Sequence, residues 1–415
     1  DGRVLFMRQA DKNGPWKAHP EEPRLLVRRE PDDFEGDFYR LFREGEVVGY
    51  DGATVSHVPP GEGLDLNRNF PAYWAPEAKQ VGAGPAPFSE PETRALGDFI
   101  TTHNNIVTAV AGHTFSGILL RSCSNKPDAE IPVNDLRAYA SMGEKGSELS
   151  GYPAVSIYHD FRYHPKQNIA GGFDWVYEHL GIYFWTIEYW APHKTAGVDM
   201  TDRKYSDWLF DHKAEDDLLV FHYFDTECPG TAYVDWYEFD HPQLGPVEIG
   251  GWDILNSFHN PPLHLLEKEI APFPQWFVYQ ALMSATLELV EASATRLGDG
   301  TYIIRLVVEN GGYLSTAGSD MARENGVSRE VVAEIDLPDN AKLLRGKKWH
   351  EIGHLPGRVG MMASPVFMGT GFDAMDGKSS RASMEWLVEA APGTTVNVTA
   401  RQERSGRVEQ SITCT

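Results

Sequence analysis

The side chains best suited to chemistry in this 415-residue sequence begin with a short polar stretch, Gly63–Pro71. In it, Arg68 stands between two amides, Asn67 and Asn69, and follows two leucines. An arginine presented beside an asparagine can donate parallel, charge-assisted hydrogen bonds to a carboxylate. The same residues also suit a loop in which asparagine caps a turn and arginine pairs with a structural acid. The stretch alone does not decide between a carboxylate-binding site and such a loop.

Two later stretches complete a pattern that resembles the zinc metallocarboxypeptidases, the carboxypeptidase A-like peptidases. In that family a zinc-binding histidine follows the Asn-Arg pair at the end of a strand. A catalytic glutamate comes later, on a strand that follows a Gly-Gly-x-Asp-Trp segment. Here the strand-like run Ile106–Val110 leads into His113, and Gly171–Trp175 precedes the strand-like run that carries Glu188. Three ordered motifs with compatible spacings form a joint signal that none of them gives alone.

The resemblance implies a role for each matching residue. His113 would be one of three protein ligands of Zn²⁺, whose open fourth position holds a water with its pKa lowered towards about 7. Glu188 would take the proton as general base and return it to the leaving amine. Asn67 and Arg68 would bind the terminal carboxylate of a peptide, so that the enzyme removes one residue at a time.

Three further positions match the family through shorter segments. Arg8 resembles the arginine that faces the scissile carbonyl oxygen, where a fixed cation stabilises the developing oxyanion. Its alternative role is a surface ion pair at a strand end. Tyr163 resembles the mobile tyrosine that closes over the terminal residue of the substrate, with Tyr158 as the alternative. Phe173 matches the position that tunes side-chain preference, and an aromatic residue there indicates an apolar terminal residue in the substrate.

The remaining two zinc ligands of the family form a His-x-x-Glu pair, which lies farther before the Asn-Arg segment than the 66 residues that precede Asn67. We therefore expect this pair to lie upstream of Asp1 and the sequence to be a fragment. His19 and Glu22 do have the His-x-x-Glu spacing, but they lie in a charged, proline-rich stretch with no strand before it. Because metal ligands are normally held on rigid elements, we expect this second pair not to bind the metal.

Composition and charge exclude two classes of protein. The formal net charge of −23 argues against a nucleic-acid binder, because neutralising phosphates requires a basic surface. No run of about 18 apolar residues occurs, so the sequence predicts no transmembrane helix.

Cys123, Cys228 and Cys414 are far apart and odd in number, which indicates isolated thiols and favours a reducing, cytoplasmic compartment. The oligomeric state stays open.

The length of the chain and its hydrophobic content of 41% predict at least two domains. We expect residues 1–288 to form a carboxypeptidase-like α/β domain, with a mixed sheet in three α/β/α layers and its N-terminal part missing. From residue 289 to 415 the sequence becomes a series of short, turn-separated strand patterns. These patterns are typical of an all-β, Ig-like sandwich, which would be an accessory domain.

The sequence therefore predicts a zinc-dependent metallocarboxypeptidase that hydrolyses the C-terminal amide bond of a peptide with a free terminal carboxylate. One alternative is a cell-wall carboxypeptidase or amidase, since the same zinc and Glu188 would serve a muropeptide with D-residues or diaminopimelate. Another alternative is a non-catalytic peptide-binding protein, which would follow if the complete gene lacks the His-x-x-Glu pair.

Overall fold

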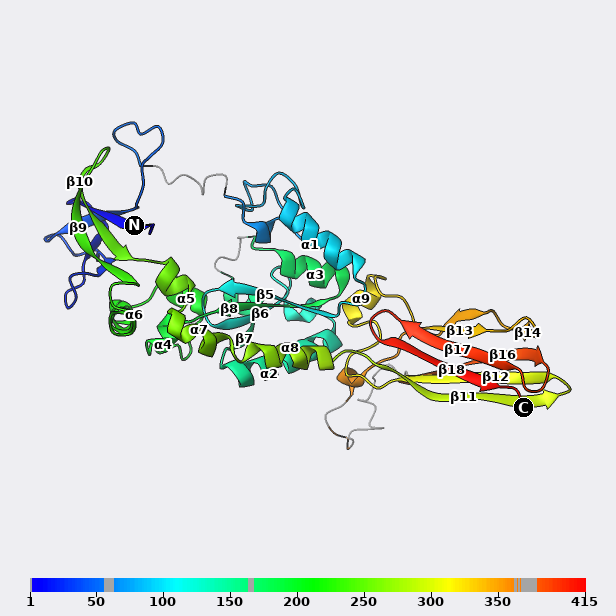
Figure 1. The fold of residues 1–415 in the computed structure, drawn as a ribbon. Helices are drawn as coiled ribbons and strands as arrows, with labels where there is room; N and C mark the ends of the chain where they lie inside the picture. The colour runs from blue at the N-terminus through cyan, green and yellow to red at the C-terminus, as the bar shows by residue number, and fades with distance from the viewer. Residues whose placement is uncertain (1, 56–62, 163–167, 362–363, 365, 367–378) are drawn as a thin grey trace.

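The computed structural model describes residues 2–55, 63–162, 168–361, 364, 366 and 379–415. These residues form three groups of strands that follow one another along an elongated molecule (Figure 1). An antiparallel sheet lies at the N-terminal end, a mixed sheet covered by helices lies in the middle, and two antiparallel sheets lie at the C-terminal end (Figure 1). No helix among these residues is long and apolar enough to cross a membrane.

The central sheet has four strands in the order β5-β8-β6-β7. Their bounds are β5 (Thr108–Thr114), β6 (Ile118–Arg121), β7 (Ala154–Ser156) and β8 (Tyr183–Tyr189). The pairs β5·β8 and β6·β7 are parallel, whereas β6·β8 is antiparallel, so the sheet is mixed as predicted. Strand β8 is buried along its length except at Tyr189, as expected for a strand that is covered on both faces.

Helices cover both faces of the central sheet (Figure 1). They are α1 (Pro91–Thr102) and α3 (Gly172–Leu180) on one face, and α2 (Val133–Ser150) and α8 (Phe273–Leu282) on the other. Successive residues of β8 point to opposite faces, so Phe184 packs into the core with α1 and α3, while Trp185 packs with α2 and α8. The predicted three-layer α/β/α arrangement is confirmed. Shorter elements complete this region: η1 (Leu66–Arg68), η2 (Asp128–Glu130), η3 (Ile157–Phe161), α4 (Pro192–Thr195), α5 (Tyr205–Phe210), α6 (Ala214–Glu227), η4 (Leu255–His259) and α7 (Leu263–Ile270).

A separate antiparallel sheet joins the start of the chain to a hairpin that follows α6. Its strands lie in the order β3-β2-β4-β1-β10-β9, with the bounds β1 (Phe6–Ala10), β2 (Trp16–Ala18), β3 (Leu26–Arg28), β4 (Phe38–Arg43), β9 (Tyr233–His241) and β10 (Gly245–Trp252). We call it the N-terminal sheet. Leu5, Met7, Val247 and Ile249 form its small core. The predicted domain 1–288 therefore contains two sheets with cores of their own.

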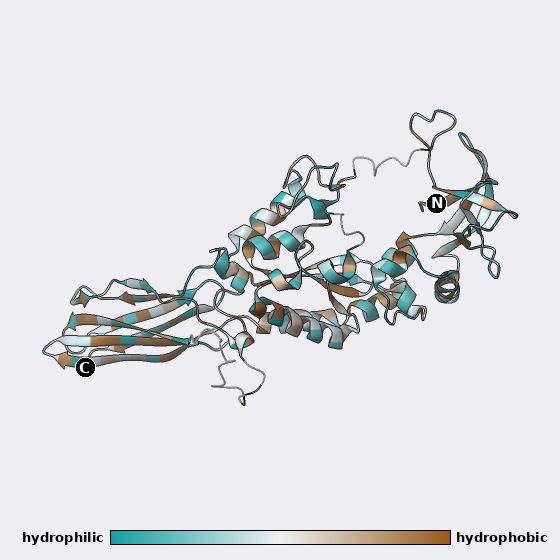
Figure 2. Ribbon diagram, turned by 180° about the vertical axis from the view of Figure 1, so that it is seen from behind, coloured by the Kyte–Doolittle hydropathy of each residue, from teal (hydrophilic) through white to brown (hydrophobic). Residues whose placement is uncertain are grey.

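The C-terminal region consists of two four-stranded antiparallel sheets. One has the order β11-β12-β16-β14 and the other β15-β13-β17-β18. Their bounds are β11 (Leu287–Gly298), β12 (Thr301–Asn310), β13 (Val332–Asp336), β14 (Ala341–Arg345), β15 (Trp349–Glu351), β16 (Arg381–Ala390), β17 (Thr395–Gln402) and β18 (Gly406–Thr413), with α9 (Asp320–Glu324) and η5 (Arg358–Gly360) in the connections. Polar and apolar residues alternate along these strands (Figure 2), and Trp386 from one sheet shares a core with Val398 from the other. The region is thus a sandwich, and its Ig-like topology remains a prediction.

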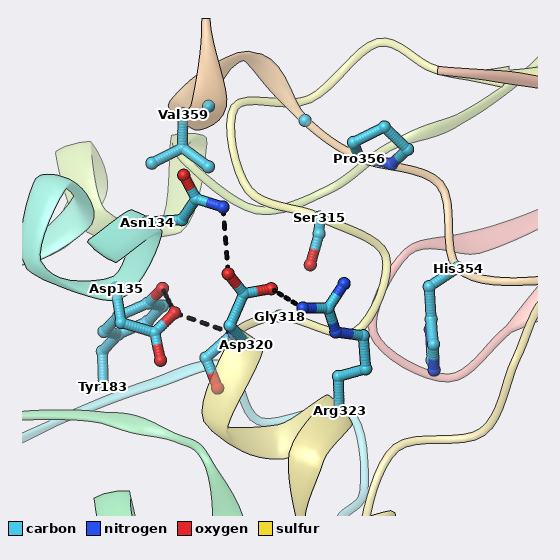
Figure 3. A pocket seen from close by; sticks show the side chains of 13 residues that line it. Asn134, Asp135, Tyr183, Ser315, Gly318, Asp320, Arg323, His354, Pro356 and Val359 are labelled. Carbon is cyan, nitrogen blue, oxygen red and sulfur yellow. Dashed lines mark hydrogen bonds and ion pairs between the residues drawn. The ribbon is translucent and has the colours of Figure 1, made fainter. Parts of the chain in front are cut away.

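The sandwich is joined to the central region by buried polar contacts. Asp135 on α2 accepts hydrogen bonds from the hydroxyl of Tyr183 at 2.9 Å and from the backbone N–H groups of Asp320 and Met321 at 2.8 and 3.0 Å. Figure 3 shows these groups beside a pocket of about 50 Å³, where Arg323 pairs with Asp320. A pocket of this size holds a few waters at most.

Candidate active site at the ends of β5 and β8

His113 and Glu188 lie opposite each other near the ends of two neighbouring parallel strands. They are register partners of the β5·β8 pair, so their side chains lie on the same face of the sheet. Glu188 lies four residues after Phe184 on the same strand, so both side chains lie on the same face of the sheet, which α1 and α3 cover. Only 8% of Glu188 is exposed, so its carboxyl group is largely shielded from solvent.

Burial governs the protonation of both residues. It lowers the pKa of His113, an effect that the Asp65 carboxylate opposes and the Arg68 guanidinium reinforces. The ring is therefore neutral near pH 7, which is the form that can bind a metal. Burial raises the pKa of Glu188 to about 8, while Arg68 acts to lower it. A carboxyl group that titrates near neutral pH is suited to taking up and returning a proton.

Arg68 lies at the end of η1, close enough to influence the charge of both His113 and Glu188. Its Nη1 donates to the carbonyl of Asn67 at 3.1 Å, and its Nη2 lies 3.6 Å from the carboxylate of Asp65. That carboxylate is about half exposed, and such a pair contributes little net free energy. The guanidinium therefore retains the capacity to bind an anionic group.

The Gly-Gly motif holds the Asn-Arg turn in place. The Oδ1 atom of Asn67 accepts a hydrogen bond from the backbone N–H of Gly172 at 2.9 Å. A Cβ atom on Gly171 would lie 2.3 Å from the carbonyl oxygen of Asn67 and 2.4 Å from its Oδ1. The turn can therefore reach the start of α3 only because residue 171 has no side chain.

Asn69 and Asp65 fix the same turn from its two ends. Asn69 is fully buried, and its Nδ2 donates to the carbonyls of Ala83 and Ala86, so it has the structural, turn-fixing role that the sequence left open. Asp65 accepts from the backbone N–H of Asn67 at 2.9 Å and caps η1. Asp65 is a site residue that was missed from the sequence, although an Asp two residues before Asn67 is a turn signal.

The structure does not bring Arg8 together with His113 and Glu188. It lies on β1 in the N-terminal sheet, where its guanidinium forms a bidentate pair with Glu248 at 2.8 and 3.2 Å. The rings of Tyr39 and Trp236 lie on it, each with its centroid 4.6 Å away. Arg8 thus forms an ion pair, as in its alternative role, but in the middle of β1 and with a largely covered side chain rather than at an exposed strand end.

The other predicted residues occupy different environments. Phe173 is buried in the core under α3, and its carbonyl accepts from the Ser122 hydroxyl at 2.8 Å. Tyr163 lies outside the described residues. His19 accepts backbone N–H groups at its Nδ1, and Glu22 binds the guanidinium of Arg24 through both carboxylate oxygens.

Of the three protein ligands that a catalytic zinc uses, the sequence predicts one, His113, among the described residues. Within the part of the chain that the structure describes, a single group of three potential ligands lies close together, and it consists of Cys123, Asp174 and Glu178. Protein groups already bind two of its three members, because Ser124 donates to Asp174 and Lys126 pairs with Glu178 at 2.5 Å. Burial also raises the pKa of the Cys123 thiol, which keeps it protonated.

A buried lysine supports the strand that carries Glu188. Nζ of Lys194 donates to the carbonyl of Gly117 at 2.9 Å, and the N–H of Gly117 donates to the carbonyl of Glu188 at 2.8 Å. Burial lowers the pKa of Lys194 to about 8. Nothing in the local sequence distinguishes Lys194 from an exposed lysine, because its position depends on how the chain turns after β8.

Comparisons with known proteins match two parts of the chain. Residues 39–201 match the family described as zinc carboxypeptidase (Peptidase M14), and residues 286–413 match a domain of unknown function (DUF8731). Mast cell carboxypeptidase A of Mus musculus is 43% identical over 129 residues, which cover 29% of this chain and 30% of that protein. The Rattus norvegicus protein of the same name is 43% identical over 65 residues, or 14% of this chain and 16% of that protein.

Two solved structures are similar over part of the chain. The thrombin activatable fibrinolysis inhibitor has a TM-score of 0.26 and 19% identity, with 45% of this chain and 49% of that chain covered. The GAE domain of GGA2p from Saccharomyces cerevisiae has a TM-score of 0.15 and 13% identity, with 30% of this chain and 93% of that chain covered. The chain thus spans less than a third of the length of the curated relatives it matches.

Proposed function

We propose that this chain, whose residues 39–201 belong to the zinc carboxypeptidase (M14) family, hydrolyses the C-terminal amide bond of peptides. One observation carries the proposal. The charge of Arg68 acts on both members of the His113–Glu188 pair, so three motifs that are far apart in the sequence meet at one end of the central sheet. An arginine that can bind a carboxylate beside a buried proton acceptor supplies two of the functions that a zinc carboxypeptidase requires.

Substrate binding would begin at the Asn-Arg turn. The guanidinium of Arg68 would bind the terminal carboxylate of the peptide with charge-assisted hydrogen bonds, and the side chain of Asn67 would fix the turn through Gly172. Because the anchor binds the chain end, the bond presented to Glu188 is the last amide bond of the peptide. Cleavage of one residue at a time follows from this position.

In the hydrolytic step, Glu188 would accept a proton from the attacking water at its carboxylate and then donate that proton to the leaving amine. His113 would contribute one of the three protein ligands of Zn²⁺. Bound zinc would lower the pKa of the water and polarise the scissile carbonyl. We give Arg8 no part in this step, because its guanidinium is bound by Glu248 in the N-terminal sheet.

Metal content tests the proposal and separates it from its two alternatives. Zinc is measured by elemental analysis on the 415-residue chain and on the full-length natural protein, with hydrolysis assayed on L-peptides, their C-terminal amides and muropeptides with D-residues. We expect zinc and activity on L-peptides together in the full-length protein. Zinc in neither form would make the chain a peptide-binding protein, and activity on muropeptides alone would favour the cell-wall enzyme. Tight zinc in the short form would point to His19 and Glu22.

A further inference from the structure

A second, much larger cavity lies between the N-terminal sheet and the peptidase region. Its volume is about 910 Å³, at the upper end of the range of about 300–1,000 Å³ that is typical of ligand sites. Aromatic and aliphatic side chains dominate its walls, among them Trp16, Leu26, Leu209, Trp236, Trp252 and Ile254. Among its lining residues, Leu41, Arg43 and Phe115 are the members that fall within the region 39–201 matched to the zinc carboxypeptidases. Most of the cavity is therefore built by segments that the family match does not cover.

Phe115 links the wall of the cavity to the strand that carries His113. This residue follows His113 by two positions, just after the end of β5, and lines the cavity. Its ring packs on Phe258 with 5.8 Å between centroids and on His259 with 5.3 Å, and both of these residues belong to η4 and line the cavity as well. The wall of the cavity thus begins where the strand that carries His113 ends.

The position of the carboxylate anchor sets the direction in which a peptide would run. Arg68 lies at the turn that packs against the start of α3. Helix α3 lies with α1 on one side of the central sheet (Figure 1). Helix α5 and the N-terminal sheet lie beyond the other end of the site, past β8 (Figure 1). If the terminal carboxylate binds Arg68, the peptide upstream of the scissile bond leaves the site past His113 and reaches Phe115.

From these relations we propose that the cavity is a subsite for the peptide residues that precede the scissile bond, with a preference for aromatic or large apolar side chains. The proposal rests on the proposed carboxypeptidase function and specifies its substrate class. The aromatic walls supply large contact areas at a low cost in side-chain entropy, as they do at binding hot spots. The guanidinium of Arg43, which lies 4.8 Å from the centroid of the Phe6 ring, adds a donor for peptide carbonyls at the rim.

Calorimetric titration of the 415-residue chain carrying Glu188→Gln, which prevents turnover, tests the subsite. The probes are an N-acetylated hexapeptide with Phe at its third and fourth residues, the same peptide with Ala there, and the dipeptide formed by its last two residues. We expect the Phe hexapeptide to bind about tenfold more tightly than the other two. Trp16→Ala removes an aromatic side chain from the wall of the cavity, and Ala214→Phe fills the cavity. Each variant should reduce the tenfold gain in affinity of the Phe hexapeptide to about twofold or less.

Trp349→Ala is the matched control, because Trp349 is 53% exposed on β15 of the sandwich. Equal binding of the two hexapeptides, or a gain that survives both cavity variants, would overturn the subsite. Should Trp16→Ala fail to fold, Ala214→Phe still decides the question, because it adds a side chain and removes none. Failure of the carboxypeptidase proposal has a separate signature, in which Arg68→Ala leaves dipeptide binding unchanged.

Discussion

His113 and Glu188 are register partners on the parallel strands β5 and β8, with Arg68 acting electrostatically on both. Neighbouring parallel strands end at the same edge of a sheet, so residues near these two strand ends are brought together whatever their separation in the sequence. A neutral imidazole and a buried carboxyl group then share one face next to a cation.

Glu188→Gln in the full-length protein is expected to lower kcat by at least about a hundredfold, because the proton acceptor is lost while the shape of the side chain is kept. Zinc content should equal that of the parent, since no metal ligand is removed. Peptide hydrolysis and elemental analysis of the same preparation check both points. A variant that keeps most of its activity would show that the mechanism assigned to Glu188 is wrong.

Arg68→Ala is expected to raise KM by roughly 10–100-fold, because a charge-assisted hydrogen bond to a carboxylate contributes about 1.5–3 kcal/mol. The discrimination between a peptide and its C-terminal amide should disappear in the same variant. Arg407→Ala is the control, since Arg407 is exposed on the sandwich and pairs with Glu409. Unchanged discrimination against the amide would place the carboxylate anchor elsewhere.

The elements that carry the three motifs could be predicted from the sequence, because local patterns determine them. The run before His113 is strand-like. The run before Glu188 is a buried strand that follows Gly181. The mixed sheet follows from family resemblance and is confirmed by the strand pairing. The number and spacing of the cysteines predicted isolated thiols, and Cys123, Cys228 and Cys414 are all free.

The environment of Arg8 could not be predicted, because it depends on pairing between distant segments. Local sequence indicates a strand at Val4–Arg8 but not its partner, and the observed strand β1 pairs with β4 and with β10, which lies more than 200 residues later in the chain. The bidentate contact with Glu248 and the stacking of Tyr39 and Trp236 arise from that pairing. The N-terminal sheet and the large cavity beside it were missed for the same reason.

Gly171→Ala tests whether the Gly-Gly motif positions the Asn-Arg turn. The added Cβ would lie 2.3 Å from the carbonyl oxygen of Asn67, so the turn must shift, although the extended backbone at residue 171 accepts alanine. We expect a rise in KM in the same direction as for Arg68→Ala, with kcat affected less. Gly298→Ala is the matched control, since its Cβ would meet nothing within 4 Å. Equal KM values in the two glycine variants would mean that the turn is positioned by other contacts.

Asp174 should make stability depend on pH. Burial raises its pKa to about 7 from an ordinary value of 3.8, although Ser124 donates to it through its backbone and its hydroxyl. Because the folded-state pKa is the higher one, the stabilising contribution is fully present below about pH 4 and is lost as the pH rises through about 7. The free energy of unfolding in urea should therefore fall from pH 5 to pH 8 more steeply in the parent than in Asp174→Asn. Parallel profiles would contradict this, and the exposed Asp336→Asn serves as the control.

Arg404 joins the sandwich to the central region, and its removal should separate the unfolding of the two regions. Its guanidinium is buried and donates to the carbonyls of Leu180 at 3.0 Å and Ala317 at 2.9 Å, with Leu180 at the C-terminal end of α3. A cation at a helix C-terminus interacts favourably with the helix dipole, and each buried carbonyl left without a donor costs about 1–3 kcal/mol. Arg404→Ala is thus expected to lower the stability of the junction by several kcal/mol and to split a single calorimetric transition into two. Arg401→Ala, which removes an exposed arginine paired with Glu334, should leave the transition unchanged. An unaltered single transition in Arg404→Ala would mean that the other junction contacts, such as those of Asp135 and of Ser319 with Gly181, suffice to couple the two regions.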